Sequence, residues 1–269
     1  MTQPEPGTPL SRTDLTLDLL HQAQTSDALA GQVIVVTGAG DGIGKAAALD
    51  FARAGAQVVL IGRTQEKLEA VYDQIEATTP TEPIILPLDL NELTTESAQE
   101  LAHGIEQTYG RLDGLLLNAS LLGDKMSITQ YPPKVWNSVM NVNLNSAFHM
   151  TQALLPLLEA GPNGRIIYTT SSVGREGRAY WGAYAVSKFA TEGLMQTLAD
   201  ELQNTSRVRV HCINPGGTRT DMRAKAYPGE DPQTVPAPEV HMPLYRYLLS
   251  PLSQPFNGIS WDARDFLTQ

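Results

Sequence analysis

The chain has 269 residues, of which 42% are hydrophobic and 18% are charged, as is typical of a globular protein large enough for one α/β domain. Its formal net charge of −10 disfavours nucleic acid and anionic membrane surfaces as partners. The single cysteine, Cys212, excludes an internal disulfide, and the five histidines show no ligand spacing, so we expect no metal site.

Residues 1–28 are predicted to be an N-terminal extension. Three prolines, at positions 4, 6 and 9, precede a stretch, 14–24, whose leucines could form a short amphipathic helix. We interpret the extension as an arm that packs on the body of the protein or on a neighbouring subunit. It lacks the basic start and apolar stretch of a secretory signal, and no apolar run is long enough for a membrane span. We therefore expect a cytoplasmic protein without a membrane partner.

From residue 29 onwards, short apolar runs alternate with helical patterns, which indicates a parallel sheet covered by helices on both faces. The predicted strands are 33–36, 58–61, 84–88, 112–117, 165–169, 208–213 and, more weakly, 258–261. The predicted helices are about 43–54, 64–77, 95–108, 133–159, 182–203 and 240–249. The sequence thus predicts a single α/β domain over 29–269, a Rossmann fold with a doubly wound seven-stranded parallel sheet.

One segment, at about 219–240, interrupts the alternation. It contains four prolines and Gly229, so it cannot form a long regular helix. Because it follows the sixth predicted strand, we predict that it is a substrate flap.

A glycine-rich stretch, Thr37-Gly-Ala-Gly-Asp-Gly-Ile-Gly44, joins the first strand to the first helix. Glycines at this position let the backbone approach a pyrophosphate, whose charge the helix N-terminus stabilises. The spacing is G-x-x-x-G-x-G rather than the strict fingerprint, and tight turns also need glycine. The place between strand and helix nevertheless favours a dinucleotide site. Asp41 is unfavourable beside a phosphate, so we expect its carboxylate to face away and accept N–H groups of the loop or helix.

The end of the second strand indicates which dinucleotide is bound. An NAD site usually has Asp or Glu there to bind the ribose 2′-hydroxyl, whereas this chain has Gly62 followed by Arg63. An arginine can bind a 2′-phosphate through charge-assisted hydrogen bonds, although a solvated arginine at a helix start is the alternative. The pattern favours NADP(H) over NAD(H).

Tyr184-Ala-Val-Ser-Lys188 places a phenol and an ammonium four residues apart, on one face of a predicted helix. A nearby cation favours the phenolate and should lower the tyrosine pKa, and an oxidised nicotinamide would add to this effect. Such a pair can arise by chance or serve helix packing, so its context decides. Ser171 follows a strand thirteen residues earlier and could bond a substrate carbonyl, while Asn143 is an unfavourable residue within a long helical stretch.

Together these motifs resemble the short-chain dehydrogenase/reductase family over about residues 29–263. The matching residues are Thr37-Gly-x-x-x-Gly-Ile-Gly44, Asp89, Asn118-Ala119, Asn143, Ser171, Tyr184-x-x-x-Lys188 and Asn214-Pro-Gly-Gly-Thr-Arg-Thr220. The stretches 171–184 and 214–222 look like the bacterial YciK-type branch of the family, whose members have no firmly assigned substrate.

The resemblance implies four catalytic residues. Tyr184 would be the general acid in reduction and the base in oxidation. Lys188 would bind the nicotinamide ribose hydroxyls and lower the tyrosine pKa. Ser171 would hold the carbonyl, and Asn143 would anchor a water that links Lys188 to solvent. Ser172 is less suitable than Ser171, because only Ser171 satisfies both S-x-x-G and the thirteen-residue spacing.

The resemblance also implies a cofactor site and an assembly. The cofactor-binding residues would be Thr37, Gly38, Gly40, Asp41, Gly42, Ile43, Gly44, Arg63, Asp89, Leu90, Asn118, Ala119, Tyr184, Lys188, Pro215, Gly216, Thr218 and Thr220. Relatives commonly form homodimers or homotetramers through helices equivalent to 95–109 and 133–159. This chain departs from the family in two places: the usual Asn-Ala-Gly ends in Ser120, and the last strand lacks the frequent closing Gly-Gly.

We therefore expect an oxidoreductase that transfers hydride between NADP(H) and a carbonyl or alcohol substrate, in particular an NADPH-dependent carbonyl reductase. An NAD-dependent alcohol dehydrogenase and a dinucleotide-binding sensor without turnover are the alternatives. The substrate would be a 3-oxoacyl thioester, or a small ketone, aldehyde or sterol-like compound, bound by 121–131, 173–183 and the flap. Arg175 and Arg178 could meet an anionic group of the substrate or be solvated.

Overall fold

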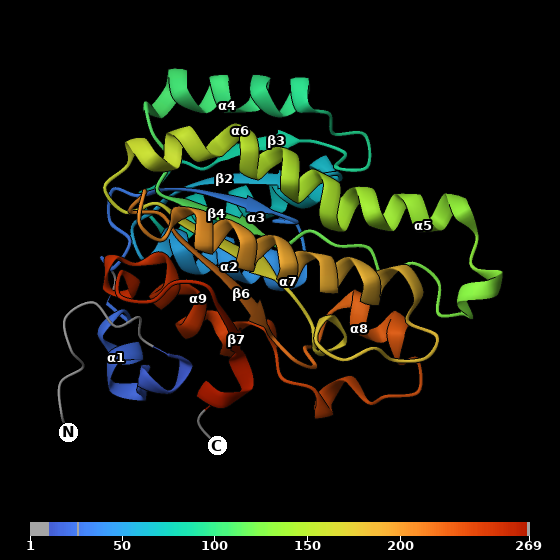
Figure 1. Cartoon of the computed structure of the whole chain (residues 1–269). Helices are drawn as coiled ribbons and strands as arrows, with labels where there is room; N and C mark the ends of the chain where they lie inside the picture. The colour runs from blue at the N-terminus through green and yellow to red at the C-terminus, as the bar shows by residue number, and fades with distance from the viewer. Residues whose placement is uncertain (1–10, 26, 268–269) are drawn as a thin grey trace.

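The computed structural model describes residues 11–25 and 27–267, which contain one seven-stranded, all-parallel sheet. The strands are β1 (Val33–Thr37), β2 (Gln57–Gly62), β3 (Ile84–Pro87), β4 (Gly114–Leu117), β5 (Arg165–Thr169), β6 (Arg209–Asn214) and β7 (Ile259–Asp262). Their order in the sheet is β3-β2-β1-β4-β5-β6-β7, and helices cover both faces (Figure 1). The predicted doubly wound Rossmann fold is confirmed.

The inner strands β1, β2 and β4 are largely apolar because each faces a hydrophobic core on either side. In β1, Ile34 and Val36 pack into the core formed with α2 (Gly42–Arg53), α3 (Gln65–Thr78) and α9 (Met242–Leu249). Val33 and Val35 point the other way, into the core formed with the helices of the opposite face. Those helices are α4 (Thr95–Tyr109), α6 (Ser146–Ala160) and α7 (Gly182–Leu202).

Two helical predictions differ from the structure. The single helix predicted over 133–159 is α5 (Pro133–Met140) and α6, joined by a π-helical turn at Asn141–Asn145. The proline-rich segment contains a short helix, α8 (Asp221–Ala226), which the sequence analysis did not predict. Six residues are enough for a single capped turn between prolines, so the exclusion of a long helix remains correct.

The described part of the N-terminal extension lies against α9. Its one α-helix, α1 (Leu17–Gln22), is shorter than predicted, and Leu20 is buried in the same core cluster as α9. Gln24 Nε2 donates to the Pro243 carbonyl at 3.3 Å. The three prolines at positions 4, 6 and 9 lie outside the described residues.

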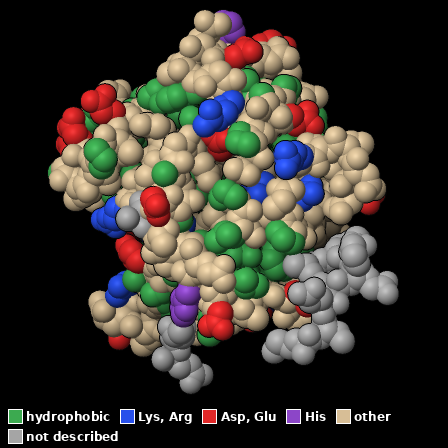
Figure 2. Space-filling model, turned by 90° about the vertical axis from the view of Figure 1, so that its left-hand side faces the viewer, with side chains coloured by type: hydrophobic (Ala, Val, Ile, Leu, Met, Phe, Trp, Pro, Cys, Tyr) green, Lys and Arg blue, Asp and Glu red, His purple; other side chains and the backbone are tan. Residues whose placement is uncertain are grey.

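The charges of the molecule are mixed rather than segregated on the face that Figure 2 shows. Lys and Arg side chains lie there between Asp, Glu and hydrophobic side chains, so neither sign covers this face (Figure 2). Among the residues that the structure describes, no helix combines the length and the apolar character needed to cross a membrane.

The sheet positions the site through the direction of its strands. All seven run parallel, so the loops that follow them meet at one edge. The strand order reverses between β1 and β4, and in open α/β sheets such a reversal leaves a crevice at the carboxyl ends.

Candidate active site

A cavity of about 480 Å³ opens at the carboxyl edge of the sheet. Most of the residues predicted from the sequence line it. They are Gly38, Gly40, Asp41, Gly42, Ile43, Arg63, Asp89, Leu90, Asn118, Ala119, Ser171, Tyr184, Lys188, Pro215, Gly216, Thr218 and Thr220. The remaining three, Thr37, Gly44 and Asn143, are not part of its lining.

The glycine-rich loop is shaped by close backbone contacts. Gly38 has a φ of 68°, and a Cβ atom there would lie 3.1 Å from the Cα of Ala119. A Cβ atom on Gly44 would lie 2.1 Å from the Gly38 carbonyl oxygen. The first turn of α2 therefore sits directly on the loop, and its N-terminus opens into the cavity.

Thr37 holds this loop to the one after β4. Its hydroxyl accepts the N–H groups of Asn118 at 2.9 Å and Ala119 at 3.1 Å, and donates to the Leu116 carbonyl at 3.3 Å. Because its hydroxyl is fully used inside the protein, Thr37 positions neighbouring residues and offers no free group to a ligand.

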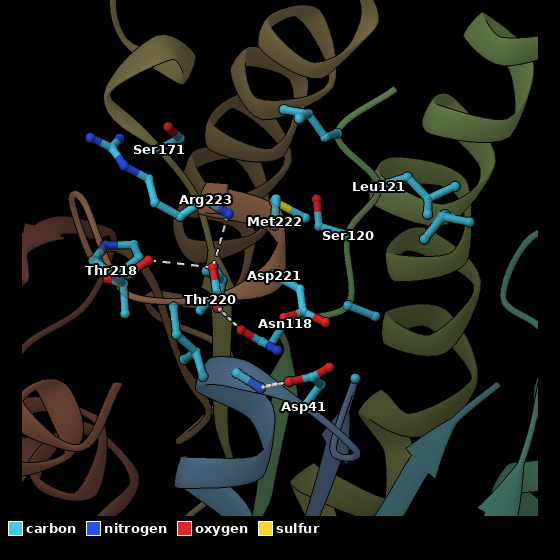
Figure 3. Close-up of a pocket in the computed structure, with 18 of the residues that line it drawn as sticks. Asp41, Asn118, Ser120, Leu121, Ser171, Thr218, Thr220, Asp221, Met222 and Arg223 are labelled. Atoms are coloured by element: carbon cyan, nitrogen blue, oxygen red, sulfur yellow. Dashed lines mark hydrogen bonds between the residues drawn. The ribbon is translucent and has the colours of Figure 1, made fainter. Parts of the chain in front are cut away.

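Asp41 caps α2, as expected from its position. Its Oδ1 accepts the Gly42 N–H at 2.7 Å (Figure 3), and its carboxylate forms an ion pair with Lys67 of α3. Burial opposes ionisation, but Lys67 and the Gly42 N–H together lower the pKa of Asp41. Lys67 also lies 4.0 Å from Asp221 and lines the cavity beside the exposed Arg63. No local sequence signal identified Lys67, because its partner is 26 residues away.

Tyr184 and Lys188 lie on one face of α7 and are buried, with 8% and 3% of their surface exposed. Lys188 Nζ donates to the Thr169 carbonyl at 2.7 Å and lies 5.6 Å from the centre of the Tyr184 ring. Ser171 begins the turn after β5 and lines the same cavity. α7 and the turn after β5 thus bring the phenol, the ammonium and the serine hydroxyl to one wall.

The protonation of this pair differs from expectation. Burial lowers the pKa of Lys188 to about 8 and raises the pKa of Tyr184 to about 12, and interaction with Ser171 opposes part of the latter rise. We expected Lys188 to lower the Tyr184 pKa, but the two influences on this pKa are the burial of the phenol, which raises it, and Ser171, which lowers it. The phenol therefore keeps its proton at neutral pH.

Asn143 occupies the π-helical turn and explains it. Its Oδ1 accepts the Leu121 N–H at 2.7 Å, and its Nδ2 donates to the Leu121 carbonyl at 3.0 Å and to Ser187 Oγ at 2.9 Å. Ser187 in turn donates to the Tyr184 carbonyl at 2.8 Å. The unfavourable mid-helix asparagine thus connects the loop after β4 with the helix that carries Tyr184.

Hydrogen bonds with Asn214 and with His241 hold the loop after β6. Gly216, with a φ of 74°, donates its N–H to Asn214 Oδ1 at 3.0 Å. Thr218 Oγ1 lies 2.9 Å from Nε2 of the buried His241, whose pKa burial lowers to about 4, so this imidazole is neutral. Thr220 bonds the Thr218 carbonyl and caps α8 (Figure 3). His241 had no motif to reveal it.

The other end of the cavity, called the apolar end below, is lined mainly by aromatic and apolar side chains, with Arg223 and Lys225 beside them. Trp181, Tyr184 and Tyr227 form a row of tilted rings, with centroids 5.8 and 6.0 Å apart, and Leu122 and Met222 pack against them. Apart from Tyr184, sequence analysis predicted the segments that supply these side chains but not the residues themselves.

Three other polar residues considered from the sequence are Ser120, Arg175 and Arg178. Ser120, which replaces the usual glycine, lines the cavity (Figure 3). Arg178 donates to the Tyr227 hydroxyl at 3.1 Å, whereas Arg175 binds Glu192 and Asp262 and is not part of the cavity wall.

Comparison with known proteins places the chain in a family. A family model described as short chain dehydrogenase matches residues 32–231. The uncharacterised oxidoreductase YciK of Escherichia coli K12 is 52% identical over 245 residues, which cover 91% of this chain and 96% of that protein. The 3-oxoacyl-[acyl-carrier-protein] reductase FabG of Thermotoga maritima is 34% identical over 197 residues, or 73% and 78% of the two chains.

Solved structures agree with these relatives. A short chain dehydrogenase from Escherichia coli CFT073 complexed with NADPH is 52% identical, with a TM-score of 0.87 over 89% of this chain and 99% of that one. A short chain dehydrogenase from Shigella flexneri complexed with NADP has the same identity and TM-score, over 89% and 100%. The chain belongs to the short-chain dehydrogenase/reductase family of oxidoreductases, in the branch that YciK represents.

Proposed function

We propose that the protein is an NADPH-dependent carbonyl reductase. The observation that carries the proposal is the wall of the cavity on which Tyr184 keeps its proton beside Ser171 and Lys188. A phenol that is protonated at neutral pH suits the donation of a proton to a reduced carbonyl oxygen.

The cavity fits a dinucleotide at its glycine-rich end. Gly38 lies so close to Ala119 that a side chain would fill the cradle, and the open N-terminus of α2 favours an anion such as a pyrophosphate. Lys188 uses one of its three N–H groups on the Thr169 carbonyl, which leaves two for the hydroxyls of a ribose. The bound cofactor would supply the hydride.

The protein's own residues would do the rest. The Ser171 hydroxyl would donate a hydrogen bond to the substrate carbonyl and orient it. As the carbonyl carbon receives the hydride, its oxygen gains charge and would take the proton of the Tyr184 hydroxyl, which yields the alcohol. Asn143 would act from behind, by holding the loop at Leu121 and the Ser187 turn of α7.

Two further observations support NADP(H) over NAD(H). The end of β2 carries no carboxylate, and both Arg63 and Lys67 line the cavity there. Two similar structures were solved with NADP or NADPH. If the protein were an NAD-dependent dehydrogenase, we would expect an acidic residue at the end of β2 to bind the ribose 2′-hydroxyl, and this chain has none. If it were a sensor without turnover, it would not need the complete set of Asn143, Ser171, Tyr184 and Lys188.

The first test is turnover. NADPH oxidation should be measured with 3-oxoacyl thioesters, small ketones, aldehydes and sterol-like ketones, for the parent and for Tyr184→Phe. We expect the variant to lose about 10³-fold in kcat, because it lacks the proton donor, while the NADPH Kd stays within about twofold. Tyr109→Phe, outside the cavity on α4, is the matched control. A kcat of Tyr184→Phe within tenfold of the parent would remove Tyr184 from this role.

The second test is cofactor preference. Arg63→Ala should raise the NADPH Kd about tenfold and leave the NADH Kd unchanged, because a charge-assisted hydrogen bond to the 2′-phosphate is lost. Arg53→Ala, at the exposed end of α2, should change neither value. Equal affinities of the parent for NADPH and NADH would contradict the assignment.

A further inference from the structure

Arg175 connects three parts of the site without lining the cavity. It directly follows the short turn Ser172–Gly174, whose N-cap is Ser171. We call residues 171–174 the serine turn. Its guanidinium contacts groups on α7 and β7: Glu192 Oε1 at 3.3 Å, Ser260 Oγ at 2.5 Å, the Trp261 carbonyl at 2.9 Å and Asp262 Oδ2 at 3.7 Å. One side chain therefore joins the serine turn to a helix and to the last strand.

The first connection leads to Lys188. Glu192 is four residues after Lys188 and so lies on the same face of α7. The serine turn packs directly on that helix, because a Cβ atom on Gly174 would lie 2.9 Å from the Lys188 backbone carbonyl carbon. The ion pair between Arg175 and Glu192 is a second link between the serine turn and α7.

The second connection leads to the loop after β6. Asp262 accepts a hydrogen bond from Asn214 Nδ2 at 3.1 Å, and Asn214 Oδ1 accepts the Gly216 N–H at 3.0 Å. Through Asp262 and Asn214, Arg175 is thus linked to the loop after β6, which also lines the cavity. A displacement of Arg175 would therefore shift both the serine turn and the loop after β6.

The charges in this network are costly to bury. The Glu192 and Asp262 side chains are only 7% and 8% exposed. Asp262 has a second cation in Arg264, at 2.5 Å, but Arg175 is the one cation that pairs with Glu192 among the described residues. A lysine could neutralise one carboxylate, whereas only the planar fork of an arginine reaches both α7 and β7 at once.

We propose that Arg175 is a positioning residue for the reaction: it fixes Ser171 relative to Lys188 and to the Gly216 loop without touching substrate or cofactor. This inference rests on the proposed function, in which Ser171 orients the carbonyl. Misplacement of an orienting group by about an ångström can cost about 10²-fold in rate, even when binding is unaffected.

The test begins with Arg175→Met. Its kcat should fall about 10- to 100-fold while its NADPH Kd stays within about threefold. The primary isotope effect with deuterated NADPH should rise, because hydride transfer becomes the slow step. The amides of Gly174 and Glu176, which bond the Ser171 and Ser172 carbonyls, should exchange with solvent at least about tenfold faster. Arg175→Lys should recover only part of each effect.

A second variant separates positioning from stability. In Arg175→Met/Glu192→Gln the unpaired buried carboxylate is gone, so the melting temperature should return towards that of the parent, while kcat and the exchange of the serine turn stay altered. Recovery of kcat together with the melting temperature would overturn the proposal. Arg246→Met, which breaks a half-buried pair with Asp50 far from the cavity, should lower stability without changing kcat.

The exchange measurement keeps the two proposals distinguishable. A parent protein that turns over no carbonyl compound would contradict the proposed function, and the exchange of the serine turn would still decide the role of Arg175. Unchanged exchange in Arg175→Met would overturn the positioning role, whatever the activity of the parent.

Discussion

The two ends of the cavity are formed by different parts of the polypeptide, namely by backbone at one end and by side chains at the other. The glycine-rich end is made of backbone, where Gly38 and Gly44 allow the loop, the start of α2 and the loop after β4 to touch. The apolar end is made of side chains, such as Trp181, Met222 and Tyr227, that come from segments far apart in the chain. A backbone site needs particular residues at fixed spacing and so leaves a motif in the sequence. A side-chain site needs only suitable volumes that meet after folding, and leaves none.

The largest expected effect is at the backbone end. Gly44→Ala places a methyl group 2.1 Å from the Gly38 carbonyl oxygen, so the loop or the first turn of α2 must move. We expect the NADPH Kd to rise about 100-fold or more, since the phosphate-binding N–H groups are displaced. Isothermal titration would measure it.

The matched control is a glycine with free space around it. A Cβ atom on Gly104, in the middle of α4, would meet no other atom within 4 Å. Gly104→Ala should leave NADPH binding unchanged and stabilise the protein by about 0.5–1 kcal/mol, because alanine loses less backbone entropy in a helix. An unaltered Kd in Gly44→Ala would mean that the backbone end tolerates side chains, and the comparison would fail.

An intermediate effect is expected where the two ends meet, at Lys188. Burial lowers its pKa from 10.5 to about 8, so the folded protein binds this proton less tightly than the unfolded chain. The destabilisation is complete below pH 8 and disappears as the pH rises to 10.5. Lys188→Met should therefore raise the free energy of unfolding at pH 7 by about 1–3 kcal/mol, with a gain that shrinks between pH 8 and 10.5.

Urea unfolding at a series of pH values would measure this gain, with Lys134→Met as the control at an exposed site. A gain that is constant or that grows with pH would show that Lys188 is not a destabilising buried charge. The expected loss of turnover in the same variant would make Lys188 a residue kept for its chemistry and not for the fold.

The smallest effect is expected at the side-chain end. Met222→Ala should raise KM for bulky apolar carbonyl compounds about fivefold, through lost contact area, and leave the NADPH Kd within twofold. Met140→Ala, at the end of α5 and outside the cavity lining, is the control. A Met222 variant that weakens NADPH and not the carbonyl compound would assign this wall to the cofactor and erase the division between the ends.

The fold could be predicted well because its signals are local. Most strands are apolar runs, because the central part of the sheet is buried on both faces, and all seven predictions overlap the observed strands. The break between α5 and α6 was missed because its cause is not local: Asn143 bonds Leu121, 22 residues earlier, and Ser187, 44 residues later. α8 was missed because a capped turn of six residues has no periodicity to detect.

Prediction of the site followed the same division. Ser171, Tyr184 and Lys188 were identified by spacing and share one wall. The pKa of Tyr184 could not be predicted, because it depends on burial, which spacing does not report. Lys67 and His241 escaped notice for a similar reason, since each acts through partners that only the fold brings near.

The hold of Asn143 on Leu121 has a consequence for how such a protein can diversify. The amide engages both the N–H and the carbonyl of Leu121 and ignores its side chain. At Leu121 the path of this loop is therefore held without help from that side chain, and Ser120 and Leu122 on either side line the cavity. Mutations there can alter which compounds are accepted while the frame persists. Because the backbone is held while the side chains can vary, related proteins can acquire new substrates and keep the same catalytic centre.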